Sequence, residues 1–208
     1  MLGYTKINLR DMSENMEAER IQAILSDFSC PFNKDVDEFL QVKAMEFSRQ
    51  QLAAVYLVFA SYKSKPVLVG YFALAQKYFH IDTGKNGRVG SNLRKRIKKF
   101  ANYDESLQKC IVSAPLIGQL GKNYKNGYNK LISGNELLKI ACDTVKEGQR
   151  ILGGKLVYLE CEDVLSLIRF YEKNGFYNFG YRLLDGDEQE KIKGKYLIQM
   201  LKYLGNEN

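Results

Sequence analysis

Residues 129–141 read Asn129-Lys130-Leu131-Ile132-Ser133-Gly134-Asn135-Glu136-Leu137-Leu138-Lys139-Ile140-Ala141. This polar loop passes into an amphipathic helix, which we expect to run from Ile132 to Leu152, after a strand over residues 111–120. The first backbone N–H groups of a helix have no intrahelical partner and lie at the positive end of the helix dipole. Ser133 and Gly134 allow a close backbone approach and Lys130 adds positive charge. The stretch therefore predicts a site for a phosphate-bearing ligand.

The chain beyond this helix repeats the order of strand and helix. Residues 155–161 predict a strand, and residues 164–173 predict a helix with Asp163 as its N-cap and Asn174-Gly175 as its end. Tyr171 lies one turn before that end, so the sequence places a phenol there. Two closing strands are expected over residues 176–184 and 196–203.

The N-terminal half predicts strands and helices in a different order. We expect a strand over residues 4–10 and then a helix that Ser13 caps and that runs through Phe28. Asn33 or Asp35 caps the next helix. An antiparallel hairpin of residues 55–60 and 67–75 follows.

The organisation of the whole chain favours one domain. From Thr83 to Asp104 the pattern is lost to glycine, asparagine and basic residues, apart from a short helix over residues 93–100. Nothing repeats and no linker divides the chain, so we predict a single mixed α/β domain over residues 1–208 with a basic insertion at about residues 84–104.

The composition restricts the partners. The formal charge is +7, which favours anionic partners, and the basic residues concentrate in one run, although such a run is also typical of a solvated helix face. The run consists of Arg88, Arg94, Lys95, Arg96, Lys98 and Lys99, with Lys85 just before it. Cys30, Cys110, Cys142 and Cys161 are scattered, which is typical of core thiols in a reducing cytoplasm. There is one histidine and no clustered set of metal ligands, so no metal is expected, and no apolar run or signal peptide indicates a membrane.

Several catalytic motifs are absent. A Ser-His-Asp triad needs a partnered histidine, and His80 lies in a strand-like run where a buried or edge position is expected. The sequence contains neither the P-loop motif nor the glycine-rich dinucleotide motif.

From about Tyr4 to Tyr203 the chain resembles the Gcn5-related N-acetyltransferases (GNAT), most clearly over residues 117–176. The family's Gln/Arg-x-x-Gly-x-Gly/Ala loop corresponds to residues 129–134, with Asn129 in place of Gln or Arg and Ile132 in place of the first glycine. The resemblance implies a mixed, mostly antiparallel sheet of about six to seven strands flanked by helices, with a splayed pair of central strands. It also implies acetyl-CoA as co-substrate, with the pyrophosphate on the loop and the pantetheine arm along the strand. The residues implied to bind it are Leu120, Gly121, Lys122, Leu131, Ser133, Gly134 and Asn135.

The family's closing signature resembles residues 170–176, and Tyr171 falls where members carry the phenol that protonates the departing CoA thiolate. The alternative is a half-buried aromatic with no chemical role. A general base is not evident, since Gln119 stands where some relatives place a glutamate. Glu160, Glu162 and Asp163 are candidates, and an acceptor α-amine with a pKa near 8 needs no base.

Residues 28–40 and 69–74 are similar to the acetyltransferase toxins of bacterial toxin–antitoxin pairs. That resemblance implies the α-amine of aminoacyl-tRNA as acceptor. It also implies that the basic run, which lies between Lys85 and Lys99, contacts the tRNA phosphates. Two other functions stay open: acetylation of a small amine or a protein amine, and a non-catalytic acyl-CoA-binding module. The oligomeric state is also open, with a homodimer among the options.

Overall fold

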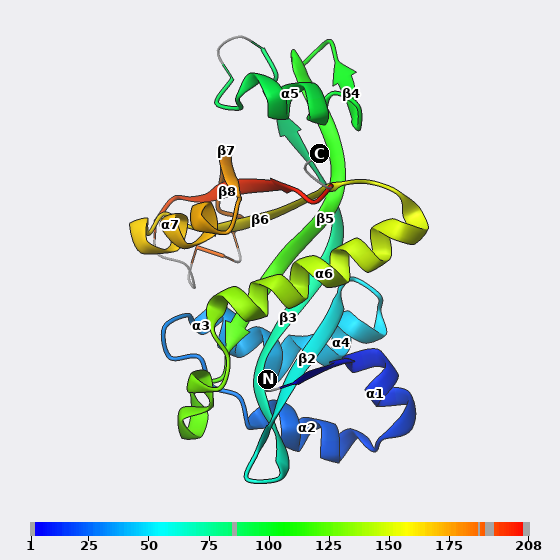
Figure 1. Cartoon of the computed structure of the whole chain (residues 1–208), viewed down its shortest axis with the longest axis vertical. Coiled ribbons are helices and arrows are strands. Elements are labelled where there is room, and N and C mark those ends of the chain that lie inside the picture. Colours follow the sequence, from blue (N-terminus) through cyan, green and yellow to red (C-terminus); the bar gives the residue numbers. More distant parts are fainter. Residues whose placement is uncertain (1–2, 85–86, 187, 190–193, 206–208) are drawn as a thin grey trace. The chain divides into compact units, whose positions relative to one another are not determined.

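The computed structural model describes residues 3–84, 87–186, 188–189 and 194–205. They form two compact units (Figure 1). The first comprises residues up to Ala75 with Gly118–Ala141, and the second comprises Gln76–Ile117 with the residues from Cys142 onward. The elements in chain order are β1 (Tyr4–Asn8), α1 (Leu9–Asn15), α2 (Ala18–Ser26), α3 (Lys34–Glu38), the π-helix η1 (Phe39–Lys43), α4 (Ala44–Arg49), β2 (Ala54–Tyr62), β3 (Lys65–Ile81), α5 (Ser91–Ile97), β4 (Ala101–Asp104), β5 (Lys109–Lys122), the 3₁₀ segment η2 (Lys125–Lys130), α6 (Gly134–Leu152), β6 (Leu156–Glu162), α7 (Leu165–Lys173), β7 (Tyr177–Leu183) and β8 (Tyr196–Tyr203).

The strands form one mixed sheet. They hydrogen-bond in the order β1-β2-β3-β5-β6-β8-β7, and β4 adds to β5. The β5–β6 pair is parallel, whereas the β1–β2, β2–β3, β4–β5, β6–β8 and β7–β8 pairs are antiparallel. The paired residues of β5 and β6 are Leu116–Tyr158 and Ile117–Leu159, so the register between these strands stops at Ile117. The expected mixed, mostly antiparallel fold is confirmed.

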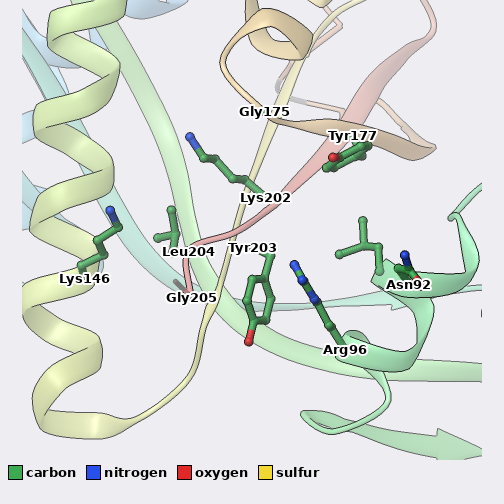
Figure 2. Close-up of a pocket in the computed structure, with 10 residues that line it drawn as sticks. Asn92, Arg96, Lys146, Gly175, Tyr177, Lys202, Tyr203, Leu204 and Gly205 are labelled. Atoms are coloured by element: carbon green, nitrogen blue, oxygen red, sulfur yellow. The ribbon is translucent and has the colours of Figure 1, made fainter. Parts of the chain in front are cut away.

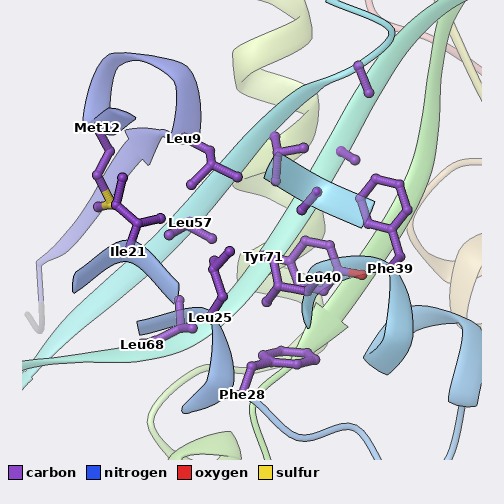
Figure 3. Packing of buried hydrophobic residues seen from close by; sticks show 14 of the residues in the cluster. Leu9, Met12, Ile21, Leu25, Phe28, Phe39, Leu40, Leu57, Leu68 and Tyr71 are labelled. Atoms are coloured by element: carbon purple, nitrogen blue, oxygen red, sulfur yellow. The ribbon is translucent and has the colours of Figure 1, made fainter. Parts of the chain in front are cut away.

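The first unit is built around the β2–β3 hairpin. Its turn holds Lys63 and Ser64 at φ of 49° and 61°, which is the backbone of a two-residue turn that matches the strand twist. Helices α1 and α2 pack their apolar side chains against the strands, as Figure 3 shows for Leu9, Ile21 and Leu57. All three are fully buried, as in a closely packed core.

One helix expected between Ser13 and Phe28 is in fact two. Asn8 caps the first, because its side chain accepts the Arg10 N–H, and Ser13 lies inside α1. At the end of α1 the Asn15 side chain donates to the Asp11 carbonyl, which competes with continuation of the helix. The backbone is then extended at Met16.

The next helical segment changes its winding. Asn33, rather than Asp35, is the N-cap of α3, since its side chain accepts the Val36 N–H at 3.0 Å. The chain then passes through the π-helix η1 into α4. Asp35 is thereby left in the first turn of α3.

The second unit holds β6, β8 and β7 with α7. Asp163 does not cap α7 as expected; Val164 is the N-cap, and the Asp163 carboxylate accepts the Tyr196 hydroxyl at 2.9 Å. The strand β4, whose residues form no apolar run and pair with the start of β5, was not expected from the sequence. His80 lies in β3 and is exposed rather than buried.

The four cysteines are buried and free, as expected for core thiols. Within the described ranges, no three histidine, cysteine or acidic side chains gather as a metal site. No helix in that part of the chain has the length and apolar character required to cross a membrane.

Candidate functional site

Strand β5 presents different chemistry on its two faces within the first unit. Successive side chains of a strand alternate between faces, so Gln119 and Gly121 share one face and Leu120 and Lys122 the other. On the second face the Lys122 ammonium donates to the carbonyls of Asn129 and Ile132, at 3.0 and 3.3 Å. Lys122 therefore ties the expected cofactor loop to the end of β5.

The loop ends in a reciprocal cap at the start of α6. Ser133 Oγ accepts the Glu136 N–H at 3.1 Å, and Glu136 Oε2 accepts the Ser133 N–H at 2.8 Å. The Tyr4 hydroxyl donates to Glu136 Oε1 and to the Leu131 carbonyl, both at 3.0 Å. These hydrogen bonds, led by those from Ser133, lower the pKa of the Glu136 carboxyl. The helix starts at Gly134, two residues later than expected.

The cap at the start of α6 determines whether the loop can bind the pyrophosphate of acetyl-CoA, the co-substrate that the resemblance implies. The Glu136 carboxylate already sits on the Ser133 N–H, so an anion at this helix N-terminus has a favourable partner. A pyrophosphate would replace that carboxylate, and the exposed Glu136 side chain has room to turn away. The Leu131 N–H donates to the Tyr128 carbonyl, so it is already occupied, and Ile132 is buried. The loop fits a phosphate-bearing co-substrate through Ser133 and Gly134 once Glu136 moves.

Gly121 lies where the other face of β5 meets α3. A Cβ atom at this position would overlap Val36 Cγ1 and lie 3.2 Å from Phe28 Cζ. The absence of a side chain therefore lets α3 pack directly on β5, in addition to any role of the Gly121 backbone toward the cofactor.

Tyr171 lies in the second unit, near the end of α7, and only 8% of it is exposed. Its ring packs against Phe170 and Phe176 at centroid distances of 5.0 and 5.8 Å. Its hydroxyl has no hydrogen-bond partner among the described residues. Burial, with a smaller contribution from Cys161, raises the pKa of the phenol, so the hydroxyl keeps its proton at neutral pH.

The carboxylates of the base candidates Glu160 on β6 and Asp163 just after it are engaged. Both oxygens of Glu160 are occupied, by Arg182 Nε at 2.5 Å and by Gln199 Nε2 at 2.9 Å. Glu160, Arg182 and Gln199 line a pocket of about 520 Å³ in the second unit. Asp163 accepts the Tyr196 hydroxyl, as described above. Glu160 is therefore a structural ion-pair partner in this arrangement rather than a free proton acceptor.

The basic run divides into structural and exposed residues. Arg94 Nη2 donates to the Val89 carbonyl at 3.1 Å, and its buried Nε finds no partner in the described part of the chain. The Arg96 guanidinium lies over the Tyr203 ring at 4.7 Å. The remaining residues of the run are exposed: Arg88, Lys95, Lys98 and Lys99. Lys85 lies outside the described residues.

Arg96 also lines a pocket of about 490 Å³ in the second unit (Figure 2). Lys146 and Lys202 bring two further ammonium groups to its wall, and Tyr177 and Tyr203 bring aromatic rings. The Lys202 ammonium donates to the Asn174 carbonyl at 2.7 Å, just beyond α7. Cations beside aromatic rings suit an anionic ligand with planar groups.

Asn123 has a structural role that the sequence did not indicate. It is fully buried after β5, and its amide donates to the carbonyls of Asp27 and Leu68 at 2.7 and 2.9 Å. Its side-chain oxygen accepts the N–H groups of Ser29 and Lys125, both at 3.0 Å. Its partners lie up to 96 residues away, so no local pattern could reveal it.

The chain is similar to known proteins in its structure. No protein-family model matches the chain, and no curated protein matches it. Among solved structures, a bacterial toxin matches with a TM-score of 0.61 and 15% identity, over 98% of this chain and 92% of that chain. AtaT in complex with acetyl-methionyl-tRNA matches with a TM-score of 0.60 and 15% identity, over 94% of each chain. A KacT mutant with one tyrosine changed to phenylalanine matches with a TM-score of 0.59 and 16% identity, over 94% of this chain and 93% of that chain. The resemblance to toxin-type acetyltransferases is thus confirmed as a likeness of fold.

Proposed function

We propose that this protein is an acetyl-CoA-dependent N-acetyltransferase that moves an acetyl group directly to a primary amine. The observation that carries the proposal is the Tyr171 hydroxyl, which has no hydrogen-bond partner among the described residues and falls where the resemblance puts the family's acid, on the fold that the chain shares with AtaT and KacT. The co-substrate supplies an activated thioester. We place its pyrophosphate at Ser133 and Gly134, and its pantetheine arm along the backbone of Leu120–Lys122.

The residues of the chain then have distinct tasks. Backbone N–H groups near Leu120 stabilise the negative charge that develops on the carbonyl oxygen as the amine attacks. Tyr171 donates its proton to the departing sulfur, because a phenol with a raised pKa is protonated over the whole neutral range. The phenolate that results is a strong base and recovers a proton from the nitrogen.

The acceptor that we favour is the α-amine of an aminoacyl-tRNA. The formal charge of +7 and the exposed lysines of the α5 region supply affinity for phosphates that does not depend on sequence. AtaT, whose fold the chain shares, was solved with acetyl-methionyl-tRNA. The pocket with Arg96, Lys146 and Lys202 is our candidate contact for the RNA backbone.

The role of Tyr171 is tested by Tyr171→Phe. We expect turnover to fall about 100-fold, the usual effect of removing a general acid, while CoA binding measured by calorimetry stays the same. Tyr56→Phe is the matched control, since Tyr56 is a half-buried tyrosine of β2 that stacks on Phe72. Unchanged turnover of the Tyr171 variant would remove Tyr171 from the mechanism.

The acceptor is tested by offering labelled acetyl-CoA with a mixture of charged tRNAs, with spermidine and with a peptide that has a free N-terminus and lysines. Transfer to charged tRNA is expected, and Arg96→Glu should weaken that transfer without affecting transfer to a small amine. Transfer to spermidine or the peptide alone would refute the tRNA acceptor. Transfer to none of them would refute the enzyme.

A second candidate, a non-catalytic acyl-CoA-binding module, is favoured by one feature of the loop. Ile132 is buried where the family has glycine, and Glu136 occupies an N–H that the pyrophosphate needs. CoA binding without any transfer would support this candidate.

A further inference from the structure

A carboxylate from α3 reaches the β5 position that carries a glutamine. Gln119 Nε2 donates to Asp35 Oδ2 at 2.7 Å, although the two residues are 84 positions apart in the chain. Among the described residues, Gln119 is the hydrogen-bond partner of the Asp35 side chain and no cation pairs with it. Asp35 is half-buried, so its second oxygen is able to meet a ligand.

The position of this carboxylate is fixed by its neighbours. The Tyr71 hydroxyl donates to the Val36 carbonyl at 2.6 Å, and Asn33 accepts the Val36 N–H. Val36 itself fills the space beside Gly121. The first turn of α3 is therefore held against β3 and β5 at several points, which is what a preorganised functional group requires.

The cofactor loop and Asp35 lie on opposite faces of β5. The loop at residues 129–132 is bonded to the Lys122 face, whereas Asp35 lies on the Gln119 face. In the proposed function the co-substrate lies on the Lys122 face of β5. The Gln119 face, where Asp35 lies, is then available to the acceptor amine. An unpaired carboxylate at that place suits an ammonium group.

We infer that Asp35, oriented by Gln119, binds the ammonium group of the acceptor and removes the proton that blocks its lone pair. This inference rests on the proposed acetyl transfer. In the step, an N–H bond of R–NH₃⁺ breaks and its proton joins the Asp35 carboxylate, which leaves the neutral amine R–NH₂. The nitrogen lone pair then forms the C–N bond to the thioester carbon as the C–S bond breaks. The sulfur takes the Tyr171 proton, the phenolate recovers the second nitrogen proton, and Asp35 releases its own to water.

The ionisable groups that lie near Asp35 are Tyr71, Cys30 and Asp37. Tyr71 of β3 is buried, and its pKa is raised well above the ordinary value by burial and then by the charges of Asp35, Cys30 and Asp37. Asp37 of α3 is occupied, since its carboxylate accepts the Cys30 N–H and the Gln41 amide. Burial also raises the pKa of the Cys30 thiol. Burial thus disfavours the charged forms of Tyr71 and Cys30, and among the described residues no cation pairs with the Asp35 carboxylate.

The first test is a titration without acetyl-CoA. An amino acid amide, which carries an α-ammonium and no carboxylate, is added to ¹⁵N-labelled protein, and the side-chain NH₂ signals of Gln119 are followed by NMR. We expect them to shift in the wild type and to stay unmoved in Asp35→Asn, which keeps an acceptor oxygen for Gln119. The N-acetylated amide, which has no charge, is the matched ligand control. Equal shifts with both ligands, or in both proteins, would overturn the inference.

The second test is the pH dependence of transfer to the amine that the wild type acetylates. Asp35→Asn should lower kcat/KM about 100-fold at pH 6.5, with the loss shrinking as pH rises and the amine loses its proton unaided. Adding Gln119→Glu should restore part of the rate, because it returns a carboxylate to the same place. Asp37→Asn on the same helix should lower stability without changing the pH profile.

The outcomes separate the two proposals. A wild-type profile that Asp35→Asn leaves unchanged overturns the role of Asp35 while acetyl transfer stands. A wild type that acetylates no amine overturns both.

Discussion

The contact between Gly121 and Val36 makes a quantitative prediction about stability. A Cβ atom at residue 121 would overlap Val36 Cγ1 and lie 3.2 Å from Phe28 and 3.4 Å from Tyr71. The φ angle of Gly121 is outside the left-handed region, so the backbone tolerates alanine and the cost of Gly121→Ala is steric. Overpacking of this kind lowers the free energy of unfolding by about 2 kcal/mol.

A second substitution should relieve that overlap. Val36→Ala alone removes two methyl groups and should cost about 1.5 kcal/mol, at about 0.8 kcal/mol each. In the double variant the new methyl at residue 121 occupies the space that Val36 leaves, so we expect a total loss of about 1.5 kcal/mol against about 3.5 kcal/mol for independent effects. Urea unfolding followed by circular dichroism measures all three.

The control is Gly148→Ala on the exposed side of α6. A Cβ atom there meets nothing within 4 Å, so the substitution should gain up to about 1 kcal/mol from helix propensity. A Gly121→Ala variant within 0.5 kcal/mol of the wild type, or losses that simply add in the double variant, would refute the packing of α3 on β5 (differences of that size are the usual limit of additivity).

Three further predictions concern polar side chains that the structure holds in place. Glu136→Gln removes a negative charge from the start of α6, so CoA should bind about threefold tighter by calorimetry, and weaker binding would show that the carboxylate supports the loop. Asn123→Ala breaks four hydrogen bonds and should lower the free energy of unfolding by about 4 kcal/mol in urea; a loss below 1 kcal/mol would contradict this accounting. The guanidinium of Arg182 lowers the pKa of Glu188 below its ordinary 4.5, so the pair stabilises the protein above that pH and the stability is lost as pH falls further. Melting temperatures between pH 3 and 7 should show this loss in the wild type and less of it in Glu188→Gln.

Local patterns in the sequence were sufficient for much of the fold. The hairpin of β2 and β3, the long helix α6 and the helix carrying Tyr171 follow from hydrophobic periodicity and from glycine stops. The break after Asn15 was missed, because a side-chain bond to a carbonyl four residues earlier leaves no signal in periodicity. The strand β4 was missed because its four residues (Ala101–Asp104) contain no apolar run and its pairing with β5 makes it a strand.

The candidate site was predictable in part. Resemblance supplied the loop at residues 129–134 and the position of Tyr171, but it could not show that Glu136 already occupies the Ser133 N–H. The sequence predicts Asn33 or Asp35 as a helix cap and Glu160 as a base candidate. Tertiary contacts distinguish the two carboxylates, since Arg182 and Gln199 engage Glu160, whereas the Asp35 side chain accepts a hydrogen bond from Gln119.

The π-helix η1 between α3 and α4 has a consequence for how the chain can vary. A π turn contains one more residue than the α-helical turn it replaces, and each residue of an α-helix advances by about 100° around the axis. Removing one residue within Phe39–Lys43 would therefore rotate α3 by about 100° relative to α4 while leaving both helices intact. Asp35 would then leave the Gln119 side of β5 although no residue that touches it had changed. In this chain the length of one helical segment, as much as the identity of any side chain, specifies which group faces the strand.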